Sequence, residues 1–463
     1  MWSIIGEEAL PPDGSLFNVL LVFVLAYICG QLVSIIRLPP LLGMLAIGFT
    51  FGNVMDLNLN QSLSATLRSI ALVIILLRAG LGLDPQVIKK LSGVCLRLSL
   101  IPCTVEAFTF AATSYLLIDL PFNWGVLLGF ILSGVSSAIV IPNMIALQER
   151  CEGTDKGIPT LLMASASVDN VMAITGFGVC VGLVFDTGSS IVWSVFKGPV
   201  SVLIGVVIGT TFGLILWYIP DKYDSYKTSP DDSKLLRLSL LILFGMFLVF
   251  VSKSVGFDGT GPLGCLILAF ITSLKWRGTP FYNPIREDLK FLWTIFEAFL
   301  FVLIGTEVKI SDLQANSIGL AIVCLLIALF MRFIVSSIVV FGVQLNLKEK
   351  IFIAISWIPK ATVQAAIGPI ALDLARDRND PQLQELAKFV LTIAVISIII
   401  TAPLGAIAMS LTANKCLKTE VRSQYEDLED NCVIRQTMEE RTEVRPLLND
   451  TSNCIQTRSL KPS

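Results

Sequence analysis

The stretch Ile158-Pro-Thr-Leu-Leu-Met-Ala-Ser-Ala-Ser-Val-Asp-Asn-Val-Met-Ala-Ile-Thr-Gly-Phe177 is long enough to cross a bilayer, yet it carries Asp169 and Asn170 near its centre. An ionised carboxylate at bilayer depth costs at least ~2.5 kcal/mol, so such a residue normally faces a protein interior or a water-filled path. A hydrogen bond to a neighbouring helix would explain Asn170 alone. An acid beside the amide, on a segment opened by Gly157 and Pro159, favours an ion or proton site in a transporter.

The composition of the whole chain is that of a membrane protein. Of its 463 residues, 54% are hydrophobic and 15% are charged, and the mean hydropathy is +0.76. Apolar segments of membrane length recur along the chain, which predicts an all-α polytopic membrane protein with about 13 transmembrane helices. The net charge of −2 gives no reason to expect binding to nucleic acid.

The cysteines and the missing histidines limit the chemistry. The ten cysteines form no CxxC pair and several lie inside apolar runs, so they are expected to be small core residues or free thiols. We therefore expect no cofactor, and no metal beyond a transported Na⁺ or Li⁺. Histidine is absent, so proton coupling near neutral pH must depend on carboxylates or amines.

Lysine and arginine are concentrated in alternate connections between the apolar segments, which by the positive-inside rule are cytoplasmic. An odd number of spans then places the N-terminus outside and the C-terminus in the cytosol. We expect a transmembrane domain over residues 1–413 and a disordered cytosolic tail over 414–463, which is charged and poor in aromatic residues. The tail holds Tyr425-Glu-Asp-Leu428 and Glu443-Val-Arg-Pro-Leu-Leu448, which match clathrin-adaptor sorting signals and suggest a plasma-membrane or endosomal/lysosomal location.

Three more charged residues lie deep inside apolar segments: Glu106, Arg332 and Lys360. Together with Asp169 they make two acids and two bases. Unpaired, each would be costly; paired, they can hold helices in register. A salt bridge between Glu106 and one of the bases could hold helices together without any role in transport. The presence of all four charges favours a functional cluster instead. We predict that Glu106, Arg332 and Lys360 form one buried cluster, whereas Glu349 is expected on the surface.

Two segments have the composition of interrupted helices: Leu132–Pro142, and Pro359–Gly368. Interrupted spans at corresponding places in the two halves of a transporter indicate a binding site near the bilayer midplane, where freed carbonyl groups can coordinate cations. A single Pro or Gly kink is common in membrane helices. The two together, on either side of a buried acid in the chain, favour an ion pathway.

Several motifs together resemble the animal NHA-type sodium/proton antiporters, the 9B subfamily of the sodium/hydrogen exchangers in the monovalent cation:proton antiporter superfamily. The motifs are Leu77-Arg-Ala-Gly-Leu-Gly-Leu-Asp84, Lys156-Gly-Ile-Pro-Thr-Leu-Leu-Met163, Ala173-Ile-Thr-Gly-Phe177, Asn346-Leu-Lys-Glu-Lys-Ile-Phe352, Pro359-Lys-Ala-Thr-Val-Gln-Ala-Ala-Ile-Gly368 and Ile400-Thr-Ala-Pro403. The resemblance runs from about residue 2 to residue 412. It implies a transporter rather than an enzyme, with an inverted-repeat fold and two crossed, unwound helices around Ser136 and Lys360.

The same resemblance implies which residues bind the ion. They are Asp169, Asn170, Ala166 and, at the first helix break, Gly134, Val135, Ser136 and Ser137. Glu106, Arg332 and Lys360 match charged core positions of the family. The chain departs from the family in two places: Asn170 replaces the second aspartate, which is the principal carrier of Na⁺ or H⁺, and Ser136-Ser137 replaces a Ser-Pro pair.

The amide at position 170 leaves three outcomes open. Antiport needs a group that binds either a proton or a cation; a desolvated carboxylate does this because burial raises its pKa, whereas an amide does not titrate. Asp169 could be the sole carrier, with Asn170 as a neutral ligand, giving Na⁺/H⁺ or Li⁺/H⁺ exchange with altered coupling. Asp169 could instead be tied to Arg332, leaving a site for an anion that moves with protons. The chain could also be transport-impaired and act as a dimer partner or regulator.

Two further expectations concern the whole molecule. A gated channel or receptor is disfavoured by the interrupted helices and the balanced buried charges. The family architecture implies a homodimer in the lipid bilayer, formed away from Asp169 by the first apolar segment and the Ile191–Ile219 region.

Overall fold

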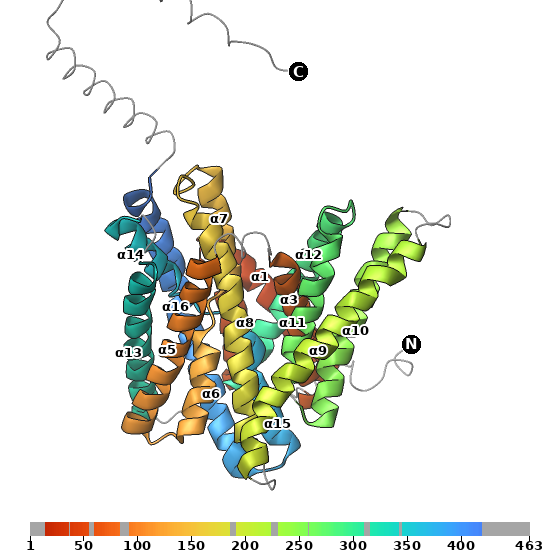
Figure 1. Cartoon of the computed structure of the whole chain (residues 1–463). Helices are drawn as coiled ribbons and strands as arrows, with labels where there is room; N and C mark the ends of the chain where they lie inside the picture. The colour runs from red at the N-terminus through yellow and green to blue at the C-terminus, as the bar shows by residue number, and fades with distance from the viewer. Residues whose placement is uncertain are drawn as a thin grey trace, which may run out of the picture.

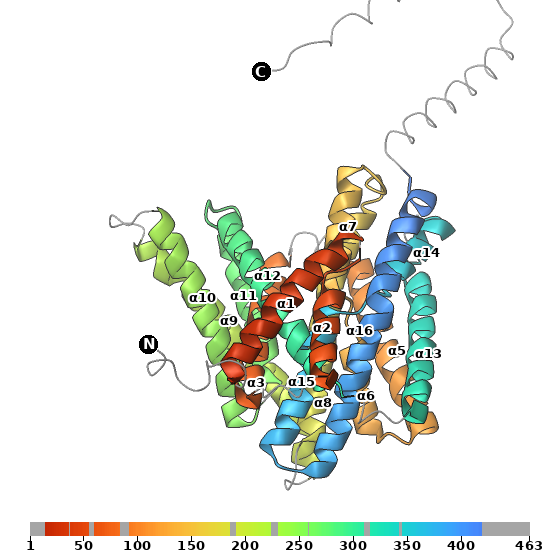
Figure 2. The same cartoon turned by 180° about the vertical axis from the view of Figure 1, so that it is seen from behind.

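The computed structural model describes residues 14–36, 38–54, 60–83, 92–185, 191–223, 230–257, 259–309, 315–341 and 345–418. Within these ranges the chain forms helices that run roughly along one common direction (Figure 1, and from behind in Figure 2). The helices pack mainly within two bundles, which are called here the scaffold bundle and the site bundle.

The scaffold bundle contains α1 (Ser15–Ile35), α2 (Leu41–Val54), α3 (Gln61–Gly82), α9 (Ile191–Tyr223), α10 (Pro230–Val255), α11 (Thr260–Trp276) and α12 (Tyr282–Glu307). The site bundle contains α5 (Ser92–Ile118), α6 (Phe122–Ser133), α7 (Ser137–Glu149), α8 (Ile158–Val184), α13 (Ala315–Val339), α14 (Leu347–Ser356), α15 (Thr362–Asp377) and α16 (Pro381–Cys416). The long helices α8 and α9 are consecutive in the chain and pack on each other, so the bundles meet there as well as along α3 and α15.

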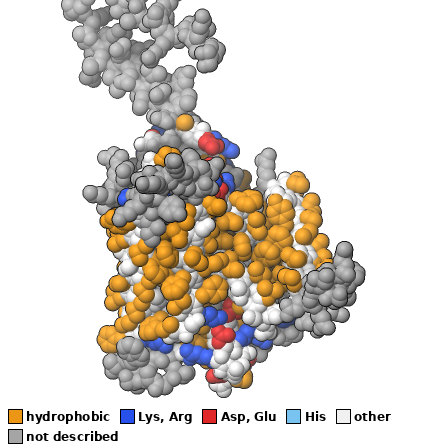
Figure 3. Space-filling view, turned by 90° about the vertical axis from the view of Figure 1, so that its right-hand side faces the viewer, with side chains coloured by type: hydrophobic (Ala, Val, Ile, Leu, Met, Phe, Trp, Pro, Cys, Tyr) orange, Lys and Arg blue, Asp and Glu red, His pale blue; other side chains and the backbone are white. Residues whose placement is uncertain are grey.

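The lengths and compositions of the helices match a membrane. Ten helical stretches in the described ranges are long and apolar enough to cross a bilayer, with α6 and α7 counted as one, and α2 and α11 are shorter apolar helices. Figure 3 shows hydrophobic side chains covering most of the height of one side of the molecule, with charged side chains gathered near its ends. The expectation of an all-α polytopic membrane protein is confirmed. The count of about 13 spans stays a prediction.

Two helices are interrupted where the sequence indicated. α6 ends at Ser133, residues 134–136 are extended, and α7 begins at Ser137. The second break covers residues 357–361, so it lies at the start of the expected Pro359–Gly368 segment, and the remainder of that segment is helical. The two breaks contact each other, because the backbone N–H of Ser136 donates to the carbonyl of Pro359 at 2.9 Å.

Local signals explain where the neighbouring helices begin. Gly157 precedes α8 in the left-handed conformation (φ 64°), which glycine adopts without a Cβ clash, and Pro159 occupies the first turn of α8. Asp380 caps α16 by accepting from the backbone N–H groups of Gln382 and Leu383.

The expectation that Glu349 lies on the surface is wrong. Its side chain is 2% exposed. It accepts from Lys156 Nζ at 2.9 Å and, as part of a capping box at the start of α14, from the backbone N–H of Asn346 at 2.7 Å. Glu349 lies between Lys348 and Lys350 in the sequence, which suggested an exposed position and gave no sign that a lysine 193 positions away would cover it.

The two ends of the molecule are called here the tail end, where α16 finishes, and the turn end, where α15 connects to α16. At the tail end, α16 finishes at Cys416, beyond the domain boundary expected at 413, and the N–H of Gly153 in the α7–α8 connection donates to the carbonyl of Lys418 at 2.8 Å. The turn end holds the connection from α15 to α16 and lies opposite (Figures 1 and 2). The two tail sorting patterns lie outside the described residues.

Candidate functional site

Asp169 occupies the middle of α8, where the helix passes the break between α6 and α7. Its side chain is fully buried, at 0% exposure. One carboxylate oxygen, Oδ1, accepts from Arg332 Nη2 at 2.8 Å, and the other, Oδ2, accepts from the backbone N–H of Val135 at 2.9 Å. The broken helix therefore supplies a donor to Asp169 that an intact helix would have used internally.

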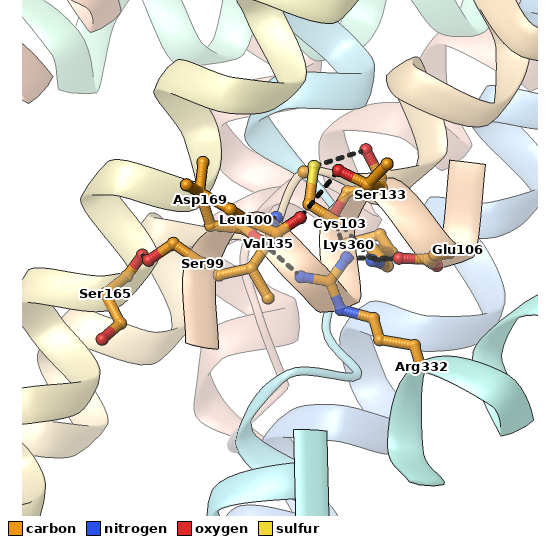
Figure 4. Close-up of polar contacts among 12 residues, drawn as sticks. Ser99, Leu100, Cys103, Glu106, Ser133, Val135, Ser165, Asp169, Arg332 and Lys360 are labelled. Atoms are coloured by element: carbon orange, nitrogen blue, oxygen red, sulfur yellow. Dashed lines mark hydrogen bonds and ion pairs between the residues drawn. The ribbon is translucent and has the colours of Figure 1, made fainter. Parts of the chain in front are cut away.

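Glu106 on α5 connects the two buried bases (Figure 4). Its Oε2 accepts from Arg332 Nη1 and from Lys360 Nζ, the latter at 2.8 Å. Lys360 belongs to the break before α15, and its backbone N–H donates to Thr401 Oγ1 at 3.0 Å. Glu106, Asp169, Arg332 and Lys360 thus form one chain of contacts, which we call the site cluster.

The site cluster is buried and electrically balanced. Glu106, Asp169 and Lys360 are 0% exposed and Arg332 is 1% exposed. With all four groups ionised, the two negative and two positive charges cancel. Arg332 Nη1 also donates to the carbonyl of Ser133, and Lys360 Nζ donates to it at 3.2 Å. Because Ser133 is the last residue of α6, the negative end of the helix dipole adds to the field that holds both bases.

Asn170 points away from this balanced set of charges. It lines a small hollow of about 20 Å³, room for roughly one water molecule, together with Ser137 and Thr362 and with apolar residues of α3 and α15. Asn170 is 4% exposed and Thr362 is 2% exposed. Asn170 Oδ1 and Thr362 Oγ1 make no hydrogen bond to the described residues, so two buried oxygens that lack a partner line this hollow.

The other predicted ion-binding residues lie around the first break, but they play different parts. Val135 donates to Asp169, and Ser136 joins the two breaks through its backbone. Gly134 packs so closely that a Cβ there would lie 2.7 Å from Val363 Cγ1. Ser137 lines the hollow, whereas Ala166 is fully buried in α8 and is not among the residues that line it.

Sequence reasoning assigned no role to Gln364, which organises the end of α6. Gln364 is 1% exposed on α15, and its Nε2 donates to the carbonyls of Ile131 and Gly134 at 2.8 Å each. Carbonyl groups at a helix end have no partner within the helix, so Gln364 satisfies them from the facing half-helix. The sequence signal that could have indicated this role is the presence of a polar amide side chain, Gln364, inside the otherwise mostly apolar Pro359–Gly368 motif.

Cys103 was read only as a small core residue, yet it lies beside the site cluster (Figure 4). Its sulfur is 3.1 Å from Ser133 Oγ. It occupies the turn of α5 before Glu106, so α5 contributes two side chains to this region.

Chemically, the arrangement combines a titratable group with neutral oxygens. Each oxygen of Asp169 already accepts one hydrogen bond, from Arg332 at Oδ1 and from Val135 at Oδ2, so a proton or a cation competes with the positive charge of Arg332 for this carboxylate. Asn170, Ser137 and Thr362 offer uncharged oxygens of the kind that bind hard cations.

Comparison with known proteins identifies relatives along nearly the whole chain. Residues 19–413 match the family model described as sodium/hydrogen exchanger, transmembrane. The chain is 43% identical over 441 residues to human sodium/hydrogen exchanger 9B2, covering 93% of this chain and 80% of that protein. It is 42% identical over 428 residues to human sodium/hydrogen exchanger 9B1, covering 90% and 81%.

A solved structure has the same fold. It is the sodium proton antiporter MjNhaP1 from Methanocaldococcus jannaschii at pH 8, with a TM-score of 0.68 and 17% identity over 87% of this chain and 98% of that one. The match agrees with the antiporter architecture that the motifs implied.

Proposed function

The chain belongs to the sodium/hydrogen exchanger family, and on that premise we propose that it exchanges a monovalent cation, Na⁺ or Li⁺, for protons across a membrane by alternating access. The observation that carries the proposal is the buried carboxylate of Asp169 where the two helix breaks meet, beside a hollow lined by oxygens of Asn170 and Thr362 that have no hydrogen-bond partner among the described residues.

In the proposed cycle Asp169 is the single titrating carrier. A proton on Asp169 removes the charge that attracts Arg332, and a cation takes the place of Arg332 when the proton leaves. Asn170 contributes a carbonyl oxygen but no charge. One carboxylate per site, rather than two, lowers the negative charge carried in each cycle, so the coupling differs from that of a site with paired aspartates.

A second candidate rests on the ion pair itself. Arg332 holds Asp169 at 2.8 Å inside a cluster whose formal charges cancel, and none of the described residues that line the hollow is a carboxylate. A site of this charge would bind Na⁺ weakly. The alternative is a transport-impaired or proton-coupled anion-carrying homologue that acts as a dimer partner or regulator.

Flux measurements on the purified protein in liposomes separate the two candidates. For the exchanger, an inward Na⁺ gradient drives proton efflux, Asp169→Asn abolishes it, and Asn170→Asp increases the charge moved per cycle. For the second candidate, the native protein is inert towards Na⁺ and Asn170→Asp gains transport. Asp155→Asn, an exposed change in the α7–α8 connection, is the matched control. Sustained Na⁺-driven flux in Asp169→Ala would refute both candidates.

We also propose a cytosolic C-terminus and adaptor-dependent sorting to the plasma membrane or to endosomes and lysosomes. The support is the distribution of Lys and Arg and the two tail patterns, Tyr425–Leu428 and Glu443–Leu448. Replacing Leu447 and Leu448 by alanine should shift the protein towards the cell surface, as measured by surface biotinylation. An unchanged distribution would remove the acidic-dileucine pattern from consideration.

A further inference from the structure

A second group of four charges lies at the turn end, away from the site cluster. Arg68 on α3 donates to Asp373 Oδ1 on α15 at 2.6 Å, and Arg376 on α15 donates to Glu307 Oε2 on α12 at 2.7 Å. Arg68 also reaches Glu307 at 3.3 Å. The side chains are 4% to 20% exposed, so solvent screens these pairs only partly.

These ion pairs join the two bundles. Arg68 and Glu307 belong to the scaffold bundle, while Asp373 and Arg376 belong to the site bundle. A third pair at the same end, Lys253 on α10 with Asp377 on α15 at 3.0 Å, is much more exposed, at 39% and 59%. By contrast, the ion pair between Lys156 and Glu349, at the other end, lies within the site bundle.

The pairs close one end of a seam that leads to Asn170. On α3, Arg68, Leu72, Ile75 and Ala79 share one helix face, because they follow each other at spacings of three and four. Leu72 lines both the hollow at Asn170 and a second hollow of about 40 Å³ that is also lined by Asp373. From Arg68 to Ala79 the helix rises about 16 Å at ~1.5 Å per residue.

The face of α15 opposite α3 follows the same course. Thr362, Val363 and Ala366 line the hollow at Asn170, and Ile370 and Asp373 line the second hollow. The two hollows therefore succeed one another along the contact between α3 and α15, and the ion pairs border the second hollow at the turn end, where Asp373 lines it.

We propose that Arg68, Glu307, Asp373 and Arg376 form a lock that closes the route between Asn170 and the turn end of the molecule. In this structure the lock is shut, since both pairs that join the bundles are formed. Movement of the site bundle along the scaffold bundle has to break the contacts of α15 with Arg68 and Glu307, which already lie 3.3 Å apart and stay paired with each other. The role of the lock in transport rests on the proposed function, whereas its position is given by the ion pairs and the two hollows.

The lock can be tested without measuring transport. A cysteine at position 79 (Ala79→Cys) places a probe in the hollow at Asn170, in a background where Cys29, Cys151, Cys416 and the two tail cysteines are serine. Sealed vesicles of either orientation, told apart by protease cleavage of the tail, are treated with a membrane-impermeant maleimide. The double change Asp373→Asn with Arg376→Gln frees α15 but leaves Arg68 and Glu307 paired. It should speed labelling from the turn end roughly tenfold, which corresponds to about 1.4 kcal/mol of lost preference for the closed state.

Two comparisons make the result decisive. Lys253→Gln breaks the exposed pair and should change labelling less than about twofold, since exposed pairs contribute little. Exchanging the partners, Arg68→Asp with Asp373→Arg, should restore slow labelling that Arg68→Asp alone has lost. This exchange decides the matter if the double change does not fold.

Unchanged labelling from the turn end in a folded double variant would overturn the lock, and so would equal acceleration by Lys253→Gln. Faster labelling in a protein without flux would leave the lock standing and count against the exchanger. The two proposals can therefore fail separately.

Discussion

Glu106 is the shared partner of both buried bases, as Arg332 is of both buried acids. Its Oε2 accepts from Arg332 and Lys360, and neither base is more than 1% exposed. A buried charge without a partner is far more costly than the pair that it came from. Removal of Glu106 is therefore expected to destabilise the fold.

We expect Glu106→Gln to destabilise the protein by roughly 3–5 kcal/mol, because it leaves two buried cations facing one remaining acid. The measurement is the melting temperature in mild detergent. The matched control is Glu385→Gln, an exposed change on α16. Equal melting temperatures for the two variants would show that Glu106 does not hold the cluster together.

At the scale of elements, the break between α6 and α7 has a backbone that suits proline at its end. Ser137 is the first residue of α7, where an N–H has no partner within the helix, and Ser136 before it is extended (φ −75°, ψ 98°), as a residue before proline must be.

Ser137→Pro, which creates the Ser-Pro pair that the resemblance to the antiporter family implies at this break, should therefore leave the melting temperature nearly unchanged. Proline at the first position of a helix forfeits no helical hydrogen bond. Proline two residues later, at Ile139, is the contrasting case, because the N–H of Ile139 donates to the carbonyl of Ser136 at 3.2 Å. A loss of stability in Ser137→Pro as large as in Ile139→Pro would contradict this account of the break.

The close contact between the two breaks gives a second prediction for these elements. Gly134→Ala should lower both stability and flux, because the new Cβ would lie 2.7 Å from Val363 Cγ1 and would push α15 away from α6. Val363→Gly in the same chain removes the Cβ of Val363 (2.9 Å from the new Cβ) as well as its two methyl groups. The double variant should melt at a higher temperature than Gly134→Ala alone, and failure of this rescue would mean that the strain lies elsewhere.

At the scale of the whole molecule, the two groups of charges are placed differently with respect to the two bundles. The site cluster is contained within one bundle, so it can move with that bundle without being broken. The charges of the lock are divided between the bundles, so relative motion must separate them. Such a division suits a transporter in which one bundle carries the site past the other.

We expect a homodimer formed mainly by α1 and α9, whose outer faces are apolar. Val207→Trp on α9 (63% exposed) should weaken the dimer, whereas Ile338→Trp on the outer face of α13 (57% exposed) should not. Native mass measurement in mild detergent reports the effect. Finding only monomers of the unchanged protein would refute the dimer itself.

The sequence by itself determined the membrane class, the two interruptions and the family. These depend on local features: apolar runs of membrane length, a Gly-Val-Ser-Ser stretch that frees a helix backbone, and Pro359 before Lys360. Each of these features affects residues close to it in the chain, so its structural effect can be predicted from the local sequence. The sequence also predicted that Glu106, Arg332 and Lys360 cluster, because three lone charges at membrane depth need partners.

Only the tertiary structure decided which partners those are and which residues face the hollow. Asp169 pairs with Arg332, 163 positions away, and Gln364 caps carbonyl groups more than 200 positions away. The surface position predicted for Glu349 was wrong because Lys156 covers its side chain. The lock joins Arg68 to Asp373, which are 305 positions apart. The choice among oppositely charged partners depends on distances and helix rotation, which packing sets. Asn170 faces the hollow while Asp169 faces Arg332 because successive residues on a helix point about 100° apart.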